Sequence, residues 1–314
     1  MPGTAAPPPT DAATVWSTWI QPVEILDVTR EQRFRDEVKG VLWPVLGLKP
    51  AGIAVDVGCG SGLLTRVLAR WMGPGSMVYG VDRDANFVAY AAARAKQERL
   101  GRRTHYLQGD AYALPLPDNV ADAVTSYTLI EHVPQHVAFV REQMRVCKPG
   151  GRVSIMEVFP GGGLSAQSPW EWGAGEREQE LSRPMDEPAA AHIDRPWAVG
   201  KSDVGGLYGL VALLEKAGLR EIMVDGFATA PSLDDARVTA EAGERRLAAE
   251  EQMLVTKAEQ LALLVEPPLP AGHVAELTRL IRARFGKRRR WLREGKRIWD
   301  WSVHVSVVVS GKVP

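Results

Sequence analysis

Short apolar runs alternate with stretches of helical periodicity between residues 50 and 158. The apolar runs have the length and composition of buried strands and lie at 53–57, 77–81, 104–107, 121–126 and 152–158. The stretches between them repeat apolar residues at helical spacing over 63–71, 85–100 and 137–146. Strands that alternate with helices in this way predict βαβ units and a parallel, doubly wound sheet.

The flanking segments follow other patterns. Residues 1–13 are rich in Pro and Ala and predict a disordered leader. Residues 14–49 carry apolar and aromatic positions at helical spacing, interrupted by Pro22 and Pro44, and predict a helical N-terminal cap. Residues 159–200 show little periodicity, and a loop of this length is typical of a functional lid or of a disordered segment.

The last third of the chain predicts two further strands, at 221–227 and 303–309, after a helix over 204–217. Helices near 234–265 and 272–297 lie between those strands, so that 230–301 forms a helical insertion. We expect one domain over 50–229 and 302–314, with the insertion either covering the active site or forming a homodimer contact. The sequence does not choose between these two roles.

Charge and cysteine content exclude several classes of protein. Lys plus Arg and Asp plus Glu both number 38, so the net charge is zero, which excludes a broadly basic nucleic-acid-binding protein. Two cysteines exclude a disulfide scaffold, and no His or Cys pair has the spacing of metal ligands. No apolar run approaches the length of a membrane span, and residues 1–14 lack the basic and apolar regions expected of a signal peptide. We therefore expect a cytoplasmic protein without a metal.

A glycine-rich turn follows the first predicted strand, with the sequence Asp56-Val57-Gly58-Cys59-Gly60-Ser61-Gly62. Glycines are needed where backbone passes close to a ligand or adopts a positive φ. The turn opens onto a helix N-terminus, which favours a carboxylate or phosphate. Leu63 stands where a dinucleotide-binding turn has its third glycine, which argues against a nicotinamide oxidoreductase.

Further motifs stand at the ends of the other predicted strands. Asp82 ends the second strand, where a carboxylate can accept both hydroxyl groups of a ribose, whereas Asp84 is better placed to cap the next helix. The third strand ends in Gly109-Asp110-Ala111. Ile130-Glu131-His132-Val133 follows the fourth strand, and Lys148-Pro149-Gly150-Gly151 precedes the fifth.

In this order and spacing, the motifs resemble those of class I S-adenosylmethionine-dependent methyltransferases of the small-molecule type, and they are most similar to the quinone-biosynthesis group. The resemblance covers residues 50–158. It implies an α/β, Rossmann-like, seven-stranded sheet that is mostly parallel, with the antiparallel last strand inserted beside the fifth. The expected architecture adds the helical N-terminal cap and the helical insertion.

The resemblance also implies S-adenosylmethionine as cofactor, with S-adenosylhomocysteine as product. Asp56 would fix the turn and receive the amino group, Asp82 would hold the ribose, and Tyr127 would lie near the sulfonium. Arg33 is the candidate for the cofactor carboxylate. The remaining cofactor candidates are Gly58, Cys59, Gly60 and Gly62 around the methionine part, and Arg83, Asp110 and Ala111 around the adenine.

Methyl transfer depends mainly on proximity and orientation, so that an obvious catalytic residue is not required. A general base matters only for a protonated acceptor. Candidates are His132, Glu131, Tyr127 and His192, although His132 and Glu131 are better explained as a motif that starts a helical turn. Nine of the ten tryptophans lie outside 50–158, and five of them are candidates for an aromatic lid over the acceptor: Trp16, Trp19, Trp170, Trp172 and Trp197.

Residues 276–300 hold ten Lys and Arg against three acids, a local charge of 10 − 3 = +7. A solvated helix face balanced by acids of the preceding helix, such as Glu244 and Glu251, is the favoured interpretation. An RNA- or membrane-facing patch and a site for an anionic acceptor are the alternatives.

The leading functional hypothesis is transfer of a methyl group from S-adenosylmethionine to a small molecule, at O, N or C, in specialised or cofactor metabolism. We expect a small-molecule acceptor and no nucleic-acid partner. One alternative is an RNA or protein methyltransferase that uses the basic helix 276–300. The other is a non-catalytic, cofactor-binding regulatory or partner protein.

Overall fold

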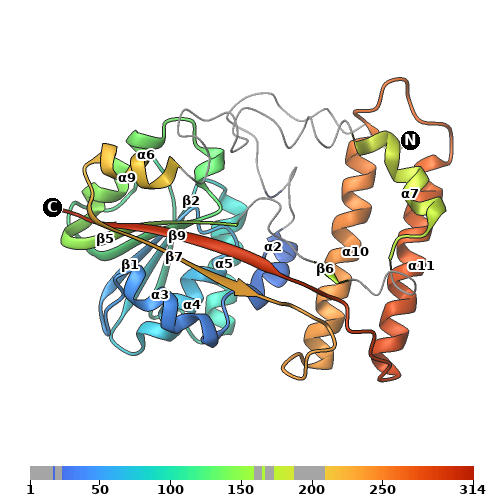
Figure 1. Ribbon diagram of the computed structural model, residues 1–314, viewed down its shortest axis with the longest axis horizontal. Helices are drawn as coiled ribbons and strands as arrows, with labels where there is room; N and C mark the ends of the chain where they lie inside the picture. The colour runs from blue at the N-terminus through green and yellow to red at the C-terminus, as the bar shows by residue number, and fades with distance from the viewer. Residues whose placement is uncertain (1–16, 18–22, 159–164, 167–172, 187–208) are drawn as a thin grey trace. The chain divides into compact units, whose positions relative to one another are not determined.

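The structure is a computed structural model that describes residues 17, 23–158, 165–166, 173–186 and 209–314 (Figure 1). Two compact units make up the chain. The sheet unit comprises residues 30–164, 196–230 and 303–314, and the helical unit comprises residues 1–29, 165–195 and 231–302.

A seven-stranded sheet forms the centre of the sheet unit, with the order β3-β2-β1-β4-β5-β9-β7. Its strands are β1 (Ile53–Val57), β2 (Met77–Asp82), β3 (Thr104–Gln108), β4 (Ala121–Tyr127), β5 (Cys147–Val158), β7 (Arg220–Thr229) and β9 (His304–Lys312). All neighbours are parallel except β9, which runs antiparallel to both β5 and β7. The predicted α/β architecture, with the antiparallel last strand inserted beside the fifth, is confirmed.

Helices cover both faces of this sheet (Figure 1). On one face, α3 (Lys39–Val45) and α4 (Leu63–Met72) share a buried cluster with Ala54 and Met156. On the other face, α6 (His136–Val146) and α9 (Leu210–Ala217) bury Val55 and Ile155. Burial on both faces explains why the strands are apolar runs rather than alternating patterns. The remaining helix, α5 (Ala85–Gln97), packs along β2 and β3.

The register of the sheet brings the carboxyl ends of the parallel strands to one edge. Val57 pairs with both Val81 and Ser126, and Tyr127 pairs with Met156. In a doubly wound sheet, ligands bind outside this edge, at the point where the strand order reverses. That reversal lies between β1 and β4.

The helical unit is built on two long helices, α10 (Ala240–Ala262) and α11 (His273–Arg293), which pack along each other. The short helix α7 (Glu176–Ser182), continued by a 3-10 turn over Arg183–Met185, packs on α11. A buried cluster that includes Leu247, Ile281 and Phe285 joins these elements. Among the described residues, no helix has the length and apolar character needed to cross a membrane.

The helical unit also contains a two-stranded antiparallel ribbon, formed by β6 (Ser165–Ala166) and β8 (Trp301–Ser302), which the sequence pattern did not predict. Two-residue strands carry too few positions to show a period. The first segment of the chain departs from the expected boundary too. The boundary between the two units lies between residues 29 and 30 rather than at 49. Residues 23–29 of α2 (Val23–Arg30) belong to the helical unit, whereas α3 belongs to the sheet unit because it packs on β7 and β9.

Replacing Phe285 by Ala is expected to destabilise the helical unit by about 3–5 kcal/mol, because the ring is buried and its loss leaves a cavity. Thermal unfolding followed by circular dichroism measures the change. Cofactor affinity, which depends on the sheet unit, is expected to stay at the wild-type value in the folded protein. A variant that unfolds at the wild-type temperature would contradict the assigned core.

Candidate active site

The glycine-rich turn lies between the end of β1 and the start of α4, at the carboxyl edge of the sheet. Gly58, Gly60 and Gly62 all have positive φ angles, of 70°, 51° and 72°. The Gly58 and Cys59 N–H groups both donate to the Val81 carbonyl oxygen of β2, over 2.8 and 3.0 Å. The turn is therefore fixed to the neighbouring strand before any ligand is considered.

Two of these glycines are required by the protein's own packing. A Cβ atom on Gly58 would lie 2.6 Å from a methyl carbon of Leu129, and one on Gly62 would lie 2.6 Å from the Cβ atom of Ala91. The ring of Tyr106 is nearly as close to the second position, at 2.7 Å. The sequence argument assigned these glycines to close approach of a ligand. The structure supplies a second reason, which is close approach of the turn to α5, β3 and the segment after β4.

Asp56, near the end of β1, stabilises the glycine-rich turn through a buried hydrogen bond. Its side chain is 1% exposed, and its Oδ2 atom accepts a hydrogen bond of 2.7 Å from the Thr65 hydroxyl in the first turn of α4. Burial raises the pKa of Asp56 to about 7, and the hydrogen bonds from Thr65 oppose this shift. The carboxyl group thus ties β1 to the beginning of α4.

Asp82 joins the turn to the next βα connection. Its Oδ2 atom accepts from the Gly60 N–H group at 2.9 Å, and its Oδ1 atom accepts from the Asp84 N–H group at 2.9 Å. Burial raises the pKa of Asp82. Each carboxylate oxygen has a second lone pair, so the group can accept further hydrogen bonds from a ligand hydroxyl. Asp84 itself caps α5 by accepting from Asn86 N–H, as the sequence indicated.

The third strand end contributes a more exposed group. Asp110 is exposed, and its Oδ1 atom accepts from the Tyr112 N–H group at 2.9 Å, which folds the carboxylate onto its own turn. Ala111 is half-buried beside it. Arg83 carries an exposed side chain, while its carbonyl oxygen accepts from Gln108 at the end of β3.

Tyr127 ends β4 within an aromatic and cationic group. Its ring packs edge-on against Phe34, with centroids 4.9 Å apart, and Phe34 in turn lies 6.1 Å from Phe227 of β7. The Arg33 Nη1 atom donates to the Tyr127 hydroxyl at 3.1 Å, and the Arg30 guanidinium lies 5.5 Å from the ring centroid. The predicted candidates Arg33 and Tyr127 therefore meet, although 94 residues separate them.

Several buried polar atoms at this edge have no hydrogen-bond partner among the described residues. They include the Nε atom of Arg33 and the hydroxyl of Thr128. Thr128 also has a φ of 51°, a conformation that is uncommon for a threonine and that concentrates at functional sites. A guanidinium N–H group without a partner is suited to a carboxylate ligand. The donor set at this edge therefore fits the carboxylate and the ribose of the expected cofactor.

Glu157, near the end of β5, is a buried carboxyl group that the sequence reading missed. It is 2% exposed, and the backbone N–H groups of Leu129 and Ile130 donate to it. Burial, strengthened by the charge of Glu131, raises the pKa of Glu157 to about 8, while Arg30 acts in the opposite direction. Glu157 therefore fixes the segment that follows β4. A lone acid within the apolar strand sequence Ser154-Ile155-Met156-Glu157-Val158 was the available signal.

The catalytic candidates after β4 lie in a 3-10 turn over Ile130–His132. The His132 Nε2 atom lies 3.2 Å from the Glu131 Oε1 atom, and both side chains are partly exposed. Cys59 is buried, which raises its pKa, and this agrees with its assignment as a turn residue rather than a nucleophile. His192 and the five lid candidates lie outside the described residues: Trp16, Trp19, Trp170, Trp172 and Trp197.

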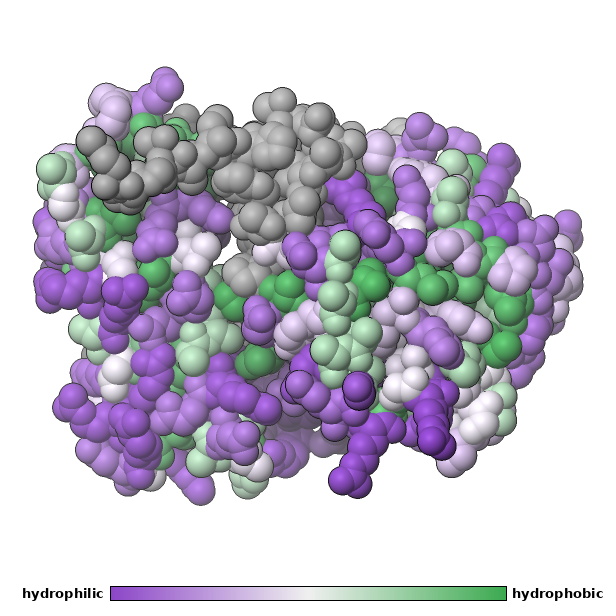
Figure 2. Space-filling model, turned by 180° about the vertical axis from the view of Figure 1, so that it is seen from behind, coloured by the Kyte–Doolittle hydropathy of each residue, from purple (hydrophilic) through white to green (hydrophobic). Residues whose placement is uncertain are grey.

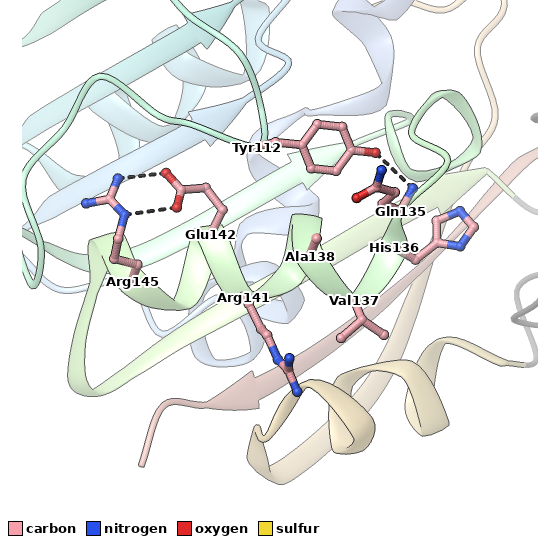
Figure 3. Close-up of a pocket in the computed structure, with 8 residues that line it drawn as sticks. All are labelled: Tyr112, Gln135, His136, Val137, Ala138, Arg141, Glu142 and Arg145. Carbon is pink, nitrogen blue, oxygen red and sulfur yellow. Dashed lines mark hydrogen bonds and ion pairs between the residues drawn. The ribbon is translucent and has the colours of Figure 1, made fainter.

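A shallow hollow of about 620 Å³ lies elsewhere on the sheet unit, along α6 (Figure 3). Its polar groups are already engaged: the Tyr112 hydroxyl accepts from Gln135 N–H, and Arg145 binds Glu142 and Asp118. Arg141 extends outward from the helix (Figure 3). None of the residues that line this hollow belongs to the motifs at the strand ends, so we do not assign the active site to it.

Comparison with known proteins identifies the domain to which these residues belong. Residues 55–155 match the sequence profile of the methyltransferase domain family. The prediction of a class I methyltransferase domain is confirmed. The methyl donor of this class is S-adenosylmethionine.

Curated relatives match the same domain. A demethylmenaquinone methyltransferase of Anoxybacillus flavithermus is 38% identical over 105 residues, which cover 33% of this chain and 44% of that protein. A 2-phytyl-1,4-naphtoquinone methyltransferase of Synechococcus elongatus is 36% identical over 110 residues, covering 35% of this chain and 47% of the relative. The chain thus spans about half the length of these relatives.

The fold of this chain is similar to that of a methyltransferase of known structure. A phosphoethanolamine N-methyltransferase of Haemonchus contortus, solved with S-adenosylhomocysteine, has a TM-score of 0.51. It is 16% identical, and the match covers 98% of this chain and 62% of that protein. At this identity the likeness concerns the fold.

The two buried carboxyl groups predict a pH dependence of stability. Because folding raises the pKa of Glu157 from 4.5 to about 8 and that of Asp56 from 3.8 to about 7, the folded protein binds more protons than the unfolded chain between those values. The free energy of unfolding should therefore fall as pH rises from about 5 to 8. Chemical denaturation across this range measures the slope.

Replacing Glu157 by Gln should reduce that slope, most clearly between pH 7 and 8, because the amide keeps the acceptor oxygen without titrating. Glu215→Gln, which replaces an exposed carboxylate on α9, is the matched control. Identical slopes in wild type and Glu157→Gln would show that Glu157 is ionised throughout.

Proposed function

We propose that the protein transfers a methyl group from S-adenosylmethionine to a small-molecule acceptor. The observation that carries this proposal is the arrangement around Asp82. Its carboxylate accepts from Gly60 N–H in the turn after β1 and from Asp84 N–H before α5. The turn that it holds follows β1, which borders the point where the strand order reverses. The methyltransferase domain match at residues 55–155 supports the same conclusion.

The described residues would provide contacts for the ribose, the carboxylate and the adenine of the cofactor. Asp82 would accept the ribose hydroxyls, and the Arg33 Nε atom would donate to the carboxylate. Asp110 and Ala111, at the end of β3, would contact the adenine. Gly58 and Gly62 would contribute by letting the turn pack closely against Leu129 and Ala91. The bound cofactor supplies an electrophilic methyl group and a good leaving group.

For the acceptor, we propose a flat aromatic ring of the naphthoquinone type in its reduced, hydroquinone form. The curated relatives named for demethylmenaquinone and 2-phytyl-1,4-naphtoquinone support this class. The rings of Tyr127, Phe34 and Phe227 are buried next to one another, and they would form the apolar backing of the acceptor site. The reduced ring is required because an oxidised quinone is itself an electrophile.

In this reaction a ring carbon of the acceptor forms a bond to the methyl carbon, and the sulfur–methyl bond breaks with its electron pair left on sulfur. The ring carbon then loses its proton to a base, which restores aromaticity. We propose that the base is His132, with Glu131 orienting the imidazole through the 3.2 Å contact between Oε1 and Nε2. Tyr127, whose hydroxyl accepts from Arg33, helps to order the site.

Asp82→Ala is expected to weaken binding of S-adenosylhomocysteine by about 1–3 kcal/mol, because charge-assisted hydrogen bonds to the ribose are lost. Calorimetric titration of the full chain measures the affinity. Asp118→Ala is the matched control, since Asp118 is an exposed carboxylate paired with Arg145 before β4. Equal affinities of the two variants would place the ribose elsewhere.

His132→Gln is expected to lower kcat about 10²- to 10⁴-fold, the usual contribution of a general base, with cofactor affinity unchanged. Single-turnover transfer of a labelled methyl group to a reduced naphthoquinone provides the measurement. His105→Gln, at an exposed position in β3, is the control. Undiminished turnover in His132→Gln would remove the residue from the mechanism.

A further inference from the structure

The basic helix α11 separates its cations into two sets. The inner set forms ion pairs within the helical unit. Arg284 binds Glu178 of α7 at 2.8 Å, the fully buried Arg288 binds Asp234 at 2.9 Å, and Arg289 binds Glu251 of α10. Acids of the preceding helix therefore neutralise part of the positive charge of α11, as the sequence indicated. Glu178 of α7 and Asp234, before α10, neutralise a further part.

The outer set is not balanced in this way. Its five members are exposed, and none forms an ion pair with a carboxylate of the described residues. Four lie in α11 and one follows it: Arg279, Arg282, Lys287 and Arg290, then Arg297. No acidic residue occurs in α11 between Glu276 and the end of the helix, and Glu276 is itself paired with Arg177. Figure 2 shows many hydrophilic side chains on the visible surface of the helical unit.

Four of these cations share one side of the helix. At 100° per residue, Arg279, Arg282, Lys287 and Arg290 fall within a sector of about 140° and extend over about 16 Å along the axis. The residues between them on this side are small: Ala283 is exposed, and a Cβ atom on Gly286 would meet nothing within 4 Å. The cations therefore border an open strip rather than bulky side chains.

Tryptophans stand at the carboxyl end of this strip. Lys287 and Lys296 lie over the Trp291 ring, 4.6 and 4.2 Å from its centroid. Arg297 lies 5.7 Å from the centroid of Trp299, whose side chain is 53% exposed. Lys, Arg and Trp together are the residues enriched where a protein meets the headgroup region of a bilayer.

From these observations we propose that the outer face of α11 binds the surface of an anionic phospholipid bilayer. The four cations would lie among the lipid phosphates, and Trp299 would enter the headgroup region. A basic patch of this size on an amphipathic helix is sufficient for such attraction, because each cation contributes at the surface. The proposal deepens the proposed function, on which it rests, since a quinone with an isoprenoid tail is held in a membrane.

The same surface favours lipid over nucleic acid. Sequence-independent nucleic-acid sites combine a basic groove with aromatic faces on which bases stack. Here cationic groups already lie against the rings on which bases would stack: Lys287 and Lys296 against Trp291, and Arg297 against Trp299. A headgroup layer needs charge and an amphipathic ring edge, and it does not need a free aromatic face.

Vesicle co-sedimentation of the full chain tests the proposal. Wild-type protein is expected to bind vesicles in which about a third of the lipid is phosphatidylglycerol, and not vesicles of phosphatidylcholine alone. The triple variant Arg279→Gln, Arg282→Gln, Arg290→Gln should bind the anionic vesicles at least about tenfold more weakly. Glutamine preserves helix propensity, and the three positions are exposed, so the fold should persist.

A matched control removes the same net charge from the sheet unit. Lys96→Gln, Arg102→Gln, Arg141→Gln alters three exposed cations and should bind vesicles as wild type does. Trp299→Asn leaves the charge unchanged and tolerates the φ of 50° at this position, and it should weaken vesicle binding several-fold. Equal loss in both triple variants would reduce the effect to net charge and overturn the proposal.

Two further results would overturn it: no binding of wild type to anionic vesicles, or tighter binding to a transfer RNA than to those vesicles at the same ionic strength. Calorimetric titration with S-adenosylhomocysteine separates this proposal from the proposed function. If the protein binds the cofactor but not the vesicles, only the membrane proposal is contradicted. If it binds the vesicles but not the cofactor, the methyltransferase function is contradicted.

Discussion

The carboxylate of Asp82 is the interaction on which the site depends. It accepts one backbone N–H from the turn after β1 and another from the start of the α5 connection. The βα connections after β1 and β2 are thereby held together, beside the point between β1 and β4 where the strand order reverses. Burial makes this group costly to ionise, and further donors lower that cost. A ribose that brings two hydroxyl groups fits this requirement.

Glu157, a buried carboxyl group, has a similar structural role on the other side of the reversal between β1 and β4. Glu157 holds the backbone that follows β4, and the same region contains Arg30, Arg33 and Tyr127. The site is therefore bordered by two carboxyl groups that accept backbone N–H groups, and by two arginines around one aromatic ring. Rigid backbone placed in this way serves a reaction whose catalysis comes mainly from proximity and orientation.

Local sequence patterns were sufficient to predict the sheet and part of the site. The strands of the sheet are buried on both faces, so they appear as apolar runs, and the cap at Asp84 depends only on residues two positions away. The partners of Glu157, Arg284 and Arg288 lie far along the chain, and no local period records them. The glycines show the same limit: the sequence identified a constrained turn at Gly58 and Gly62, but only the fold shows Leu129 and Ala91 against them.

A crystal structure of the protein with S-adenosylhomocysteine tests the central claim most directly. The account predicts both ribose hydroxyls within hydrogen-bond distance of the Asp82 carboxylate, with the Gly60 and Asp84 N–H bonds retained. It also predicts the ligand carboxylate against the Nε atom of Arg33. A ligand seated in the hollow along α6, or a ribose that contacts neither Asp82 oxygen, would contradict the account.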